Sequence, residues 1–294
     1  MLRTRHLIII LTWLSLIFCA SSALAAARGI LYAVHSNSTT TYLLGSVHVG
    51  KKEFYPLPKI VDKSFNEAGL LVMEIDPEKA NSPALQQNVM RTSLYPAGDS
   101  LRNHVAPATY ELAVKEAGAL GLPGPAVERF KPWMIAITLQ VLYFQKHGFS
   151  AEEGIEQYFF RKVEGRKPVV ELESAEFQIK LLSSFEENEQ EMFLLDTLQN
   201  ISNTTMLDAM MKAWQEGDAR TLENVIMQPL REHPEILPIY EKLFFSRNRN
   251  MADQIERLLK EKKRPFVVIG AGHLLGKDGV VEILRRKGYR VEQQ

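Results

Sequence analysis

Two histidines follow a glycine at the same spacing, in Gly45-Ser-Val-His48 and Gly270-Ala-Gly-His273. Two neutral imidazoles with one or two carboxylates suit a divalent metal such as zinc, manganese or cobalt, and leave a position open for water. Such a metal lowers the pKa of bound water and polarises a carbonyl, while a spare glutamate can accept the proton. The pattern predicts a metal-dependent hydrolytic site formed by the two histidines with Glu74 and Glu173.

Each of these groups lies in or after a short apolar run that is typical of a buried strand. The runs at 40–45 and 264–270 are rich in β-branched and aromatic residues and end in glycine, and the glutamates belong to similar runs at 70–77 and 167–174. In an open α/β sheet, ligand-binding and catalytic residues lie beyond the carboxyl ends of the strands. We therefore expect a central, mostly parallel or mixed sheet whose strand-end Gly-x-x-His motifs deliver both imidazoles to one edge.

Glu74 stands inside its apolar run, where an ionised carboxylate needs a cation or hydrogen-bond donors. An unpaired buried charge costs several kcal/mol or more. Glu74 is therefore a metal ligand, an acid/base group or half of a structural ion pair, and its surroundings in the sequence leave these three readings open.

The segments between the expected strands are helical in pattern. Residues from about 80 to 167 and from 174 to 264 carry apolar periodicity, capping residues and closing glycines that are typical of helices. Strands are expected again at both ends of the domain, at 29–35 and 289–292. A chain of 294 residues suits one large domain or a domain with an insertion, and the pattern favours an α/β domain with a large helical insertion.

The first 25 residues have the pattern of a secretory signal peptide. Arg3 and Arg5 precede an apolar run from Leu7 to Phe18, and Ala23-Leu-Ala25 supplies a cleavage site. This predicts a periplasmic or secreted protein; the alternatives are an uncleaved anchor and a lipoprotein attached through Cys19. Because Cys19 is the only cysteine, cleavage after residue 25 would exclude disulfides, thiolate ligands and a cysteine nucleophile from the mature chain.

The balance of charges, the hydropathy and the absence of other known motifs narrow the possible functions further. The chain has 35 lysines and arginines and 35 aspartates and glutamates, so it has no excess of positive charge that would attract nucleic acid. No apolar run after the first 25 residues is long enough to cross a bilayer. The sequence contains no His-Glu-x-x-His, Gly-x-Ser-x-Gly, phosphate-loop or dinucleotide-binding pattern.

Five ordered motifs resemble those of the TraB/GumN family, and together they span nearly all of the chain after residue 25. They are Leu43–Gly50, Met73–Asp76, Leu172–Gln178, Arg247–Met251 and Gly270–Val280. That family is related to the Tiki metalloproteases, in a clan with erythromycin-esterase-like and ChaN-like proteins. The resemblance implies an α/β fold with a helical insertion, formed here as a single domain over residues 26–294.

The resemblance also implies roles for individual residues. The two Gly-x-x-His histidines and Glu74 match the family's motif positions, and Glu173 matches the glutamate of its Leu-Glu-Thr/Ser motif, which favours Glu173 over Glu171. Polar motif positions implied in substrate binding are matched by Gln178, Arg247 and Asn248.

One departure from the family pattern occurs at Gly154-Ile-Glu156, where the family usually has aspartate. The longer acid keeps the charge but moves it by a methylene. No role is assigned to Glu156 from the sequence.

The leading hypothesis is a secreted or periplasmic metal-dependent hydrolase that acts on a peptide or other amide. Either Glu74 or Glu173 would act as ligand and the other as base, and Arg247 would steady a developing oxyanion or a substrate carboxylate. The alternatives are an envelope protein that binds a peptide, haem or metal without turnover, and a structural partner in an envelope complex.

Overall fold

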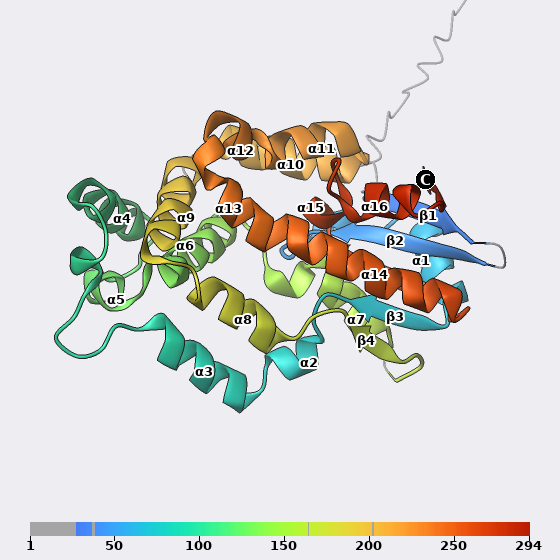
Figure 1. Ribbon diagram of the computed structural model, residues 1–294, viewed down its shortest axis with the longest axis horizontal. Helices are drawn as coiled ribbons and strands as arrows, with labels where there is room; N and C mark the ends of the chain where they lie inside the picture. The colour runs from blue at the N-terminus through green and yellow to red at the C-terminus, as the bar shows by residue number, and fades with distance from the viewer. Residues whose placement is uncertain (1–27, 37–38, 164, 202) are drawn as a thin grey trace, which may run out of the picture.

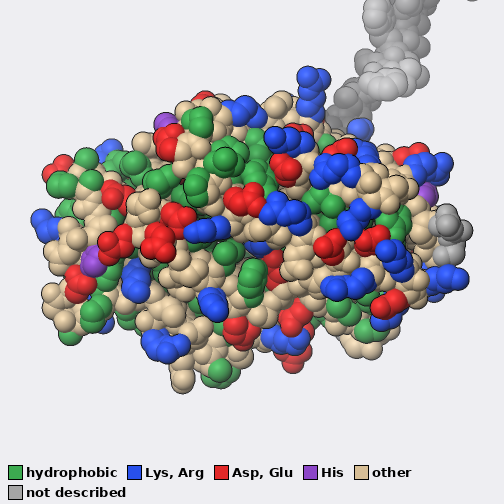
Figure 2. Space-filling model, in the orientation of Figure 1, with side chains coloured by type: hydrophobic (Ala, Val, Ile, Leu, Met, Phe, Trp, Pro, Cys, Tyr) green, Lys and Arg blue, Asp and Glu red, His purple; other side chains and the backbone are tan. Residues whose placement is uncertain are grey.

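The computed structural model describes residues 28–36, 39–163, 165–201 and 203–294. The predicted signal peptide, residues 1–25, lies outside the described residues. Among the described helices, none combines the length and the apolar character that a membrane crossing requires. On the face shown in Figure 2, acidic and basic side chains are interspersed, as expected from their equal numbers in the sequence.

The centre of the fold is a six-stranded mixed sheet with strand order β4-β3-β5-β2-β1-β6. The four strands from β4 to β2 are parallel to one another, whereas β1 is antiparallel to both of its neighbours. The mixed α/β prediction is therefore confirmed. The strands are β1 (Ile30–His35), β2 (Thr40–Ser46), β3 (Leu70–Met73), β4 (Val169–Glu171), β5 (Pro265–Gly270) and β6 (Arg290–Gln293).

Helices occupy the two long connections within the sheet, from β3 to β4 and from β4 to β5 (Figure 1). The first connection contains α2 (Pro77–Ala80), α3 (Pro83–Ser93), α4 (Pro107–Ala119), α5 (Gly124–Arg129), α6 (Pro132–Lys146) and α7 (Ile155–Val163). The second contains α8 (Ala175–Ser183), α9 (Glu187–Asn200), α10 (Thr204–Glu216), α11 (Ala219–Ile226), α12 (Gln228–Glu232), α13 (Leu237–Tyr240), a π-helical segment (Glu241–Phe245) and α14 (Ser246–Lys260). The remaining helices are α1 (Lys59–Glu67), α15 (Ala271–Leu274) and α16 (Val280–Arg286), and short 3-10 turns lie at Lys52–Phe54, Leu101–Asn103, Ala151–Glu153 and Pro234–Ile236.

The apolar composition of the inner strands follows from the layers that cover them. In Figure 1, α14 crosses in front of the sheet while α1 and α7 lie behind it. Every residue of β3 and β5 is buried. A strand covered on both faces has no solvent side, so its sequence is continuously apolar rather than alternating.

Trp214 connects the helical part of the fold to the end of β2. Its ring is fully buried and packs against Phe54 at a centroid distance of 5.3 Å. Its indole nitrogen donates a 2.8 Å hydrogen bond to the carbonyl oxygen of Gly45. Gly45 is the second-last residue of β2, and His48 lies in the loop that follows this strand. Helix α10 therefore supports the strand end that leads to His48.

Trp214→Phe should destabilise the protein more than Trp133→Phe, by about 1–3 kcal/mol. Both tryptophans are almost completely buried, but the indole nitrogen of Trp133 has no hydrogen-bond partner among the described residues. The two substitutions therefore remove similar ring volume, and only the first removes a hydrogen bond. Urea unfolding of both variants measures the difference, and equal losses would show that the bond to Gly45 contributes nothing.

Candidate functional site

The four residues singled out in the sequence follow the carboxyl ends of four adjacent parallel strands. Ser46 of β2 is paired with Gly270 of β5, and His48 and His273 follow these strand ends. Glu74 comes directly after β3, and Glu173 comes two residues after β4. The strand pairing therefore brings both histidines and both glutamates to one edge of the sheet.

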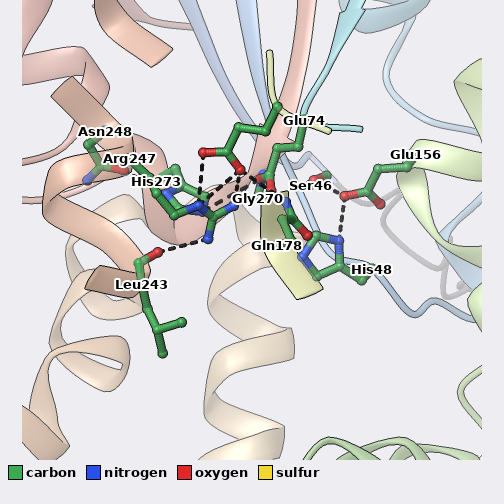
Figure 3. Close-up of polar contacts among 11 residues, drawn as sticks. Ser46, His48, Glu74, Glu156, Gln178, Leu243, Arg247, Asn248, Gly270 and His273 are labelled. Carbon is green, nitrogen blue, oxygen red and sulfur yellow. Dashed lines mark hydrogen bonds and ion pairs between the residues drawn. The ribbon is translucent and has the colours of Figure 1, made fainter. Parts of the chain in front are cut away.

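Three of these side chains converge on the α-carbon of Gly270 (Figure 3). A β-carbon placed there would lie 3.0 Å from Oε1 of Glu74, 3.5 Å from Cδ2 of His273 and 3.6 Å from Nε2 of His48. The backbone amide of Gly270 donates a 2.5 Å hydrogen bond to Oε1 of Glu74. Glycine is thus used where a side chain would fill the space between the two imidazoles and the carboxylate.

Each imidazole is oriented through its Nδ1 atom. Nδ1 of His48 lies 2.7 Å from Oε1 of Glu156, and Nδ1 of His273 lies 2.6 Å from Oδ1 of Asn248. The Asn248 amide is itself fixed, because its Nδ2 donates to the carbonyl of Asp278 at 2.8 Å. With both Nδ1–H groups directed at acceptors, the Nε2 atoms are left to face the common space, as they do in metal-ligating histidines.

The charge states of the three converging groups differ. Burial lowers the pKa of His273 to about 4, so this imidazole is neutral at pH 7. The Glu156 carboxylate raises the pKa of His48 to about 9. Burial alone would raise the pKa of Glu74, but His273, which is protonated at the low pH where Glu74 titrates, His48, Arg247 and the Gly270 amide outweigh it and lower the pKa to about 2. A cation binding at Nε2 of His48 must therefore displace a proton.

Arg247 forms a buried ion pair with Glu173 beside this space. Its Nε donates to both oxygens of Glu173 at 3.0 Å, and its Nη2 donates to Oε2 of Glu173 at 2.8 Å and to Oε2 of Glu74 at 3.1 Å. Nη1 donates to the carbonyl of Leu243 at 2.8 Å. Gln178 adds a 3.1 Å hydrogen bond from its amide to Oε2 of Glu173. Both oxygens of Glu173 are thus engaged by the guanidinium, and each of the three guanidinium nitrogens donates at least one hydrogen bond.

The residues that were selected from the sequence therefore do not all lie at the same place in the site. His48, His273 and Glu74 meet at Gly270, whereas the Glu173 carboxylate, with 1% of its side chain exposed, is turned toward Arg247. Asn248 is 1% exposed and contacts His273 from behind, so in this arrangement it orients the imidazole and does not reach the cleft described below.

Glu156 was not selected from the sequence, yet it contacts His48 directly. Its Oε1 accepts hydrogen bonds from His48 and from the hydroxyl of Ser46, and its Oε2 is buried without a hydrogen-bond partner among the described residues. The family pattern has an acid at the position of Glu156 in Gly154-Ile-Glu156, and this match could have drawn attention to the residue. The sequence alone does not show that α7 places this acid beside β2.

An open cleft passes over the converging groups. A cavity of about 380 Å³ extends from His48, Glu74 and His273 along apolar side chains of α8, α9 and α13, and a second of about 350 Å³ lies on the other side of His48. The two cavities share His48, Glu74 and Gln178. The side chain of His48 is 71% exposed because it projects into this cleft. We refer to the two cavities together as the candidate cleft.

The donor set fits a divalent cation in chemistry but is not gathered into a closed coordination shell. Imidazole nitrogens and a carboxylate oxygen suit zinc, manganese and cobalt. Nε2 of His273 lies 3.7 Å from Oε1 of Glu74, a separation compatible with two ligands of one ion. Within the ranges that the structure describes, however, no group of three or more ligating side chains already stands in metal-binding arrangement.

Arg247→Met should destabilise the protein by about 3–5 kcal/mol, because it leaves the Glu173 carboxylate buried without its cation. The double variant Arg247→Met, Glu173→Leu removes both charges and should recover much of that loss. Urea unfolding of the wild type, both single variants and the double variant forms a complete cycle. Additive losses in the double variant would contradict the ion pair.

Comparison with known proteins places the chain in a family. The TraB/PrgY/gumN family model matches residues 30–293. The uncharacterized protein YbaP of Escherichia coli (strain K12) is 28% identical over 286 residues, which cover 92% of this chain and 100% of that protein. Metalloprotease TIKI2 of Xenopus tropicalis is 39% identical over 83 residues, which cover 26% of this chain and 16% of that protein.

Metalloprotease TIKI1 of Danio rerio shows a similar partial match, 43% identical over 53 residues that cover 17% of this chain and 11% of that protein. No solved structure matches the chain. Since the family model covers nearly all of the described residues, the chain belongs to the TraB/PrgY/gumN family.

Proposed function

We propose that this protein is a metal-dependent hydrolase that cleaves a peptide or other amide bond in the candidate cleft. The observation that carries the proposal is the convergence of two imidazole rings and the Glu74 carboxylate at Gly270, with each Nδ1 held by an acceptor behind it. Membership of the TraB/PrgY/gumN family and the partial similarity to proteins named metalloproteases support a hydrolase.

In this proposal His48, His273 and Glu74 would hold a divalent cation, either manganese, cobalt or zinc. When bound, such a cation supplies Lewis-acid activation of water and of the substrate carbonyl. Glu156 keeps the Nδ1 proton on His48, and Asn248 keeps the Nδ1 proton on His273. These two contacts fix the ring orientations that the ligands need.

Glu74 and Glu173 take separate parts in the proposal. Glu74 lines both cavities and is ionised, so its carboxylate is the one placed to act as a ligand in the cleft. Glu173 is assigned to holding Arg247, because both of its oxygens already accept hydrogen bonds from the guanidinium. Arg247 in turn positions Glu74 through Nη2. The role of Arg247 in steadying an oxyanion or a substrate carboxylate stays a prediction.

The shape of the cleft favours a chain-like substrate. The two cavities meet at His48, Glu74 and Gln178. The middle of a ligand that fills both cavities would therefore lie over the converging histidines and Glu74. An extended peptide can lie in this way with a backbone amide at the junction, whereas a compact molecule fills only one side. Secretion through the signal peptide at 1–25 belongs to the proposal, and a peptide or protein substrate outside the cytoplasm would follow from it.

A second candidate is an envelope protein that binds a peptide, haem or metal without turnover. Its peptide-binding form is favoured by the contact between Arg247 and Glu74, since a guanidinium at 3.1 Å already neutralises part of the charge that would attract a cation. This candidate predicts stoichiometric binding with no product.

The His48→Ala, His273→Ala double variant should lose bound metal that the wild type retains after loading with manganese, cobalt or zinc. Plasma mass spectrometry of the desalted proteins measures the metal content directly. The matched control is the His35→Ala, His233→Ala double variant, whose histidines line neither cavity of the candidate cleft and which should keep the wild-type content. Equal metal in all three proteins would remove the proposed mechanism.

The same three proteins, incubated with a peptide library and each metal, separate the two candidate functions. Cleavage by the wild type and the control, with none by the His48→Ala, His273→Ala variant, supports the hydrolase. Metal binding without any product supports the binding protein.

Gly270→Ala should lower metal affinity by about tenfold or more and cost only about 1–2 kcal/mol of stability. Gly270 has φ −48°, which alanine can adopt, so the methyl group acts by filling the space 3.0 Å from Oε1 of Glu74. Isothermal titration with manganese and urea unfolding measure the two effects separately. Unchanged metal affinity would mean that the ion does not sit beside Gly270.

Gly118→Ala provides the control for the glycine substitution. An added methyl at this α4 position meets no atom within 4 Å, so stability should rise by about 0.5–1 kcal/mol and metal affinity should not change.

A further inference from the structure

A further cavity, of about 260 Å³, opens beside the candidate cleft and meets it at Gln140, Asp196 and Tyr240. It lies among α6, α9 and α10, and residues of α11, α12 and α13 complete its wall. Much of its wall is apolar, with side chains such as Phe144, Met206, Leu207 and Met210. We call it the side cavity. Because it shares three residues with the cleft, a ligand that passes over the histidines can continue into it.

Asp196 stands where the cleft and the side cavity meet, and its charge is not compensated. Its carboxylate accepts a 3.1 Å hydrogen bond from the amide of Asn200, and no ion pair to it occurs among the residues that the structure describes. Burial raises the pKa of Asp196, although His233 opposes this effect. A partly buried carboxylate with one neutral donor keeps much of its desolvation cost, and a cation brought to it recovers that cost.

Tyr143, on the wall of the same cavity, provides a second polar group that lacks a partner of its own among the described residues. Its side chain belongs to α6 and the residue is 9% exposed, yet its hydroxyl has no hydrogen-bond partner within the described ranges. Buried hydroxyl groups are almost always paired, because an unmade hydrogen bond costs about 1–3 kcal/mol. A ligand that offers a carbonyl oxygen here would pair this hydroxyl.

We propose that the side cavity binds a positively charged group of an otherwise apolar peptide, with Asp196 pairing the cation and the Tyr143 hydroxyl donating to a peptide carbonyl. The inference rests on the proposed function, since it names the class of peptide that the candidate cleft receives. The apolar wall takes the methylenes or the neighbouring side chain of the same peptide. A lysine or arginine side chain and a free amino terminus share this chemistry.

The composition of the wall argues against a sugar ligand. A saccharide presents hydroxyl groups around its whole ring, but methionine, leucine, isoleucine and aromatic carbon line much of the side cavity beside its polar groups. An anionic ligand is excluded by Asp196, because two like charges in a partly buried site repel each other.

Calorimetric titration with three short peptides tests the proposal without relying on cleavage. The probes are acetyl-leucyl-leucyl-lysine amide, its neutral analogue with norleucine in place of lysine, and the norleucine peptide with a free amino terminus. EDTA is present throughout to prevent metal-dependent turnover. The wild type should bind at least one of the two cationic peptides about tenfold more tightly than the neutral one, and the peptide that does so identifies the source of the charge.

Asp196→Asn should abolish this preference while leaving affinity for the neutral peptide nearly unchanged, because asparagine retains an oxygen that can accept from Asn200. Tyr143→Phe should weaken all three peptides by a similar factor of about three to ten. Glu67→Gln, an exposed acid on α1 that lines neither the cleft nor the side cavity, should behave as the wild type.

A preference that survives in Asp196→Asn, or a wild type that binds the neutral peptide equally well or binds no peptide, would overturn the inference. Cleavage of library peptides without any preference for a positive charge would leave the hydrolase standing and refute this inference alone. An Asp196-dependent preference in a protein that cleaves nothing would support the inference and refute the hydrolase.

Discussion

The parallel pairing of β2 with β5 is the constraint on which the candidate site depends. These strands are far apart in the sequence, yet the register Ser46 to Gly270 makes them end side by side. A shift of register by one residue would move one histidine relative to the other by about 3.3 Å and turn every side chain of the shifted strand to the other face. Burial on both faces favours this register, because every residue of β5 is buried and a shift would disturb its packing on both sides.

A second requirement is that the charges at this edge compensate one another. Arg247 lies between Glu173 and Glu74 and is only 11% exposed, so one guanidinium serves two buried carboxylates. On the other side of the cleft, Glu156 is matched to His48. The remaining ring, that of His273, is kept neutral by burial. The edge therefore holds several ionisable groups in little space, and each has a fixed partner that sets its orientation.

Much of the strand framework could be predicted because it is encoded locally. Continuous apolar runs closed by glycine indicated the inner strands, and their common geometry indicated that the groups following them share an edge. The finer assignments could not be predicted, because they depend on which side chains meet across the fold. Whether Glu173 faces an ion or a guanidinium depends on the position of Arg247 in α14, and whether Glu156 reaches His48 depends on how α7 packs behind β5.

The same limit applies to the cleft. Asp196 and Tyr143 belong to helices whose sequences show only ordinary amphipathic or apolar patterns, so nothing local distinguishes them from surface or core residues. Their significance arises only where α6, α9 and the chain around α13 enclose a cavity.

The strand order has a consequence for synthesis of the chain. β5 lies between β2 and β3 in the middle of the sheet, although almost all of the polypeptide precedes it. A nascent chain that has not yet reached residue 265 therefore presents two apolar strand edges with no partner, and such edges invite pairing with other chains. The two edges stay without their partner until the central strand is synthesised near the end of translation.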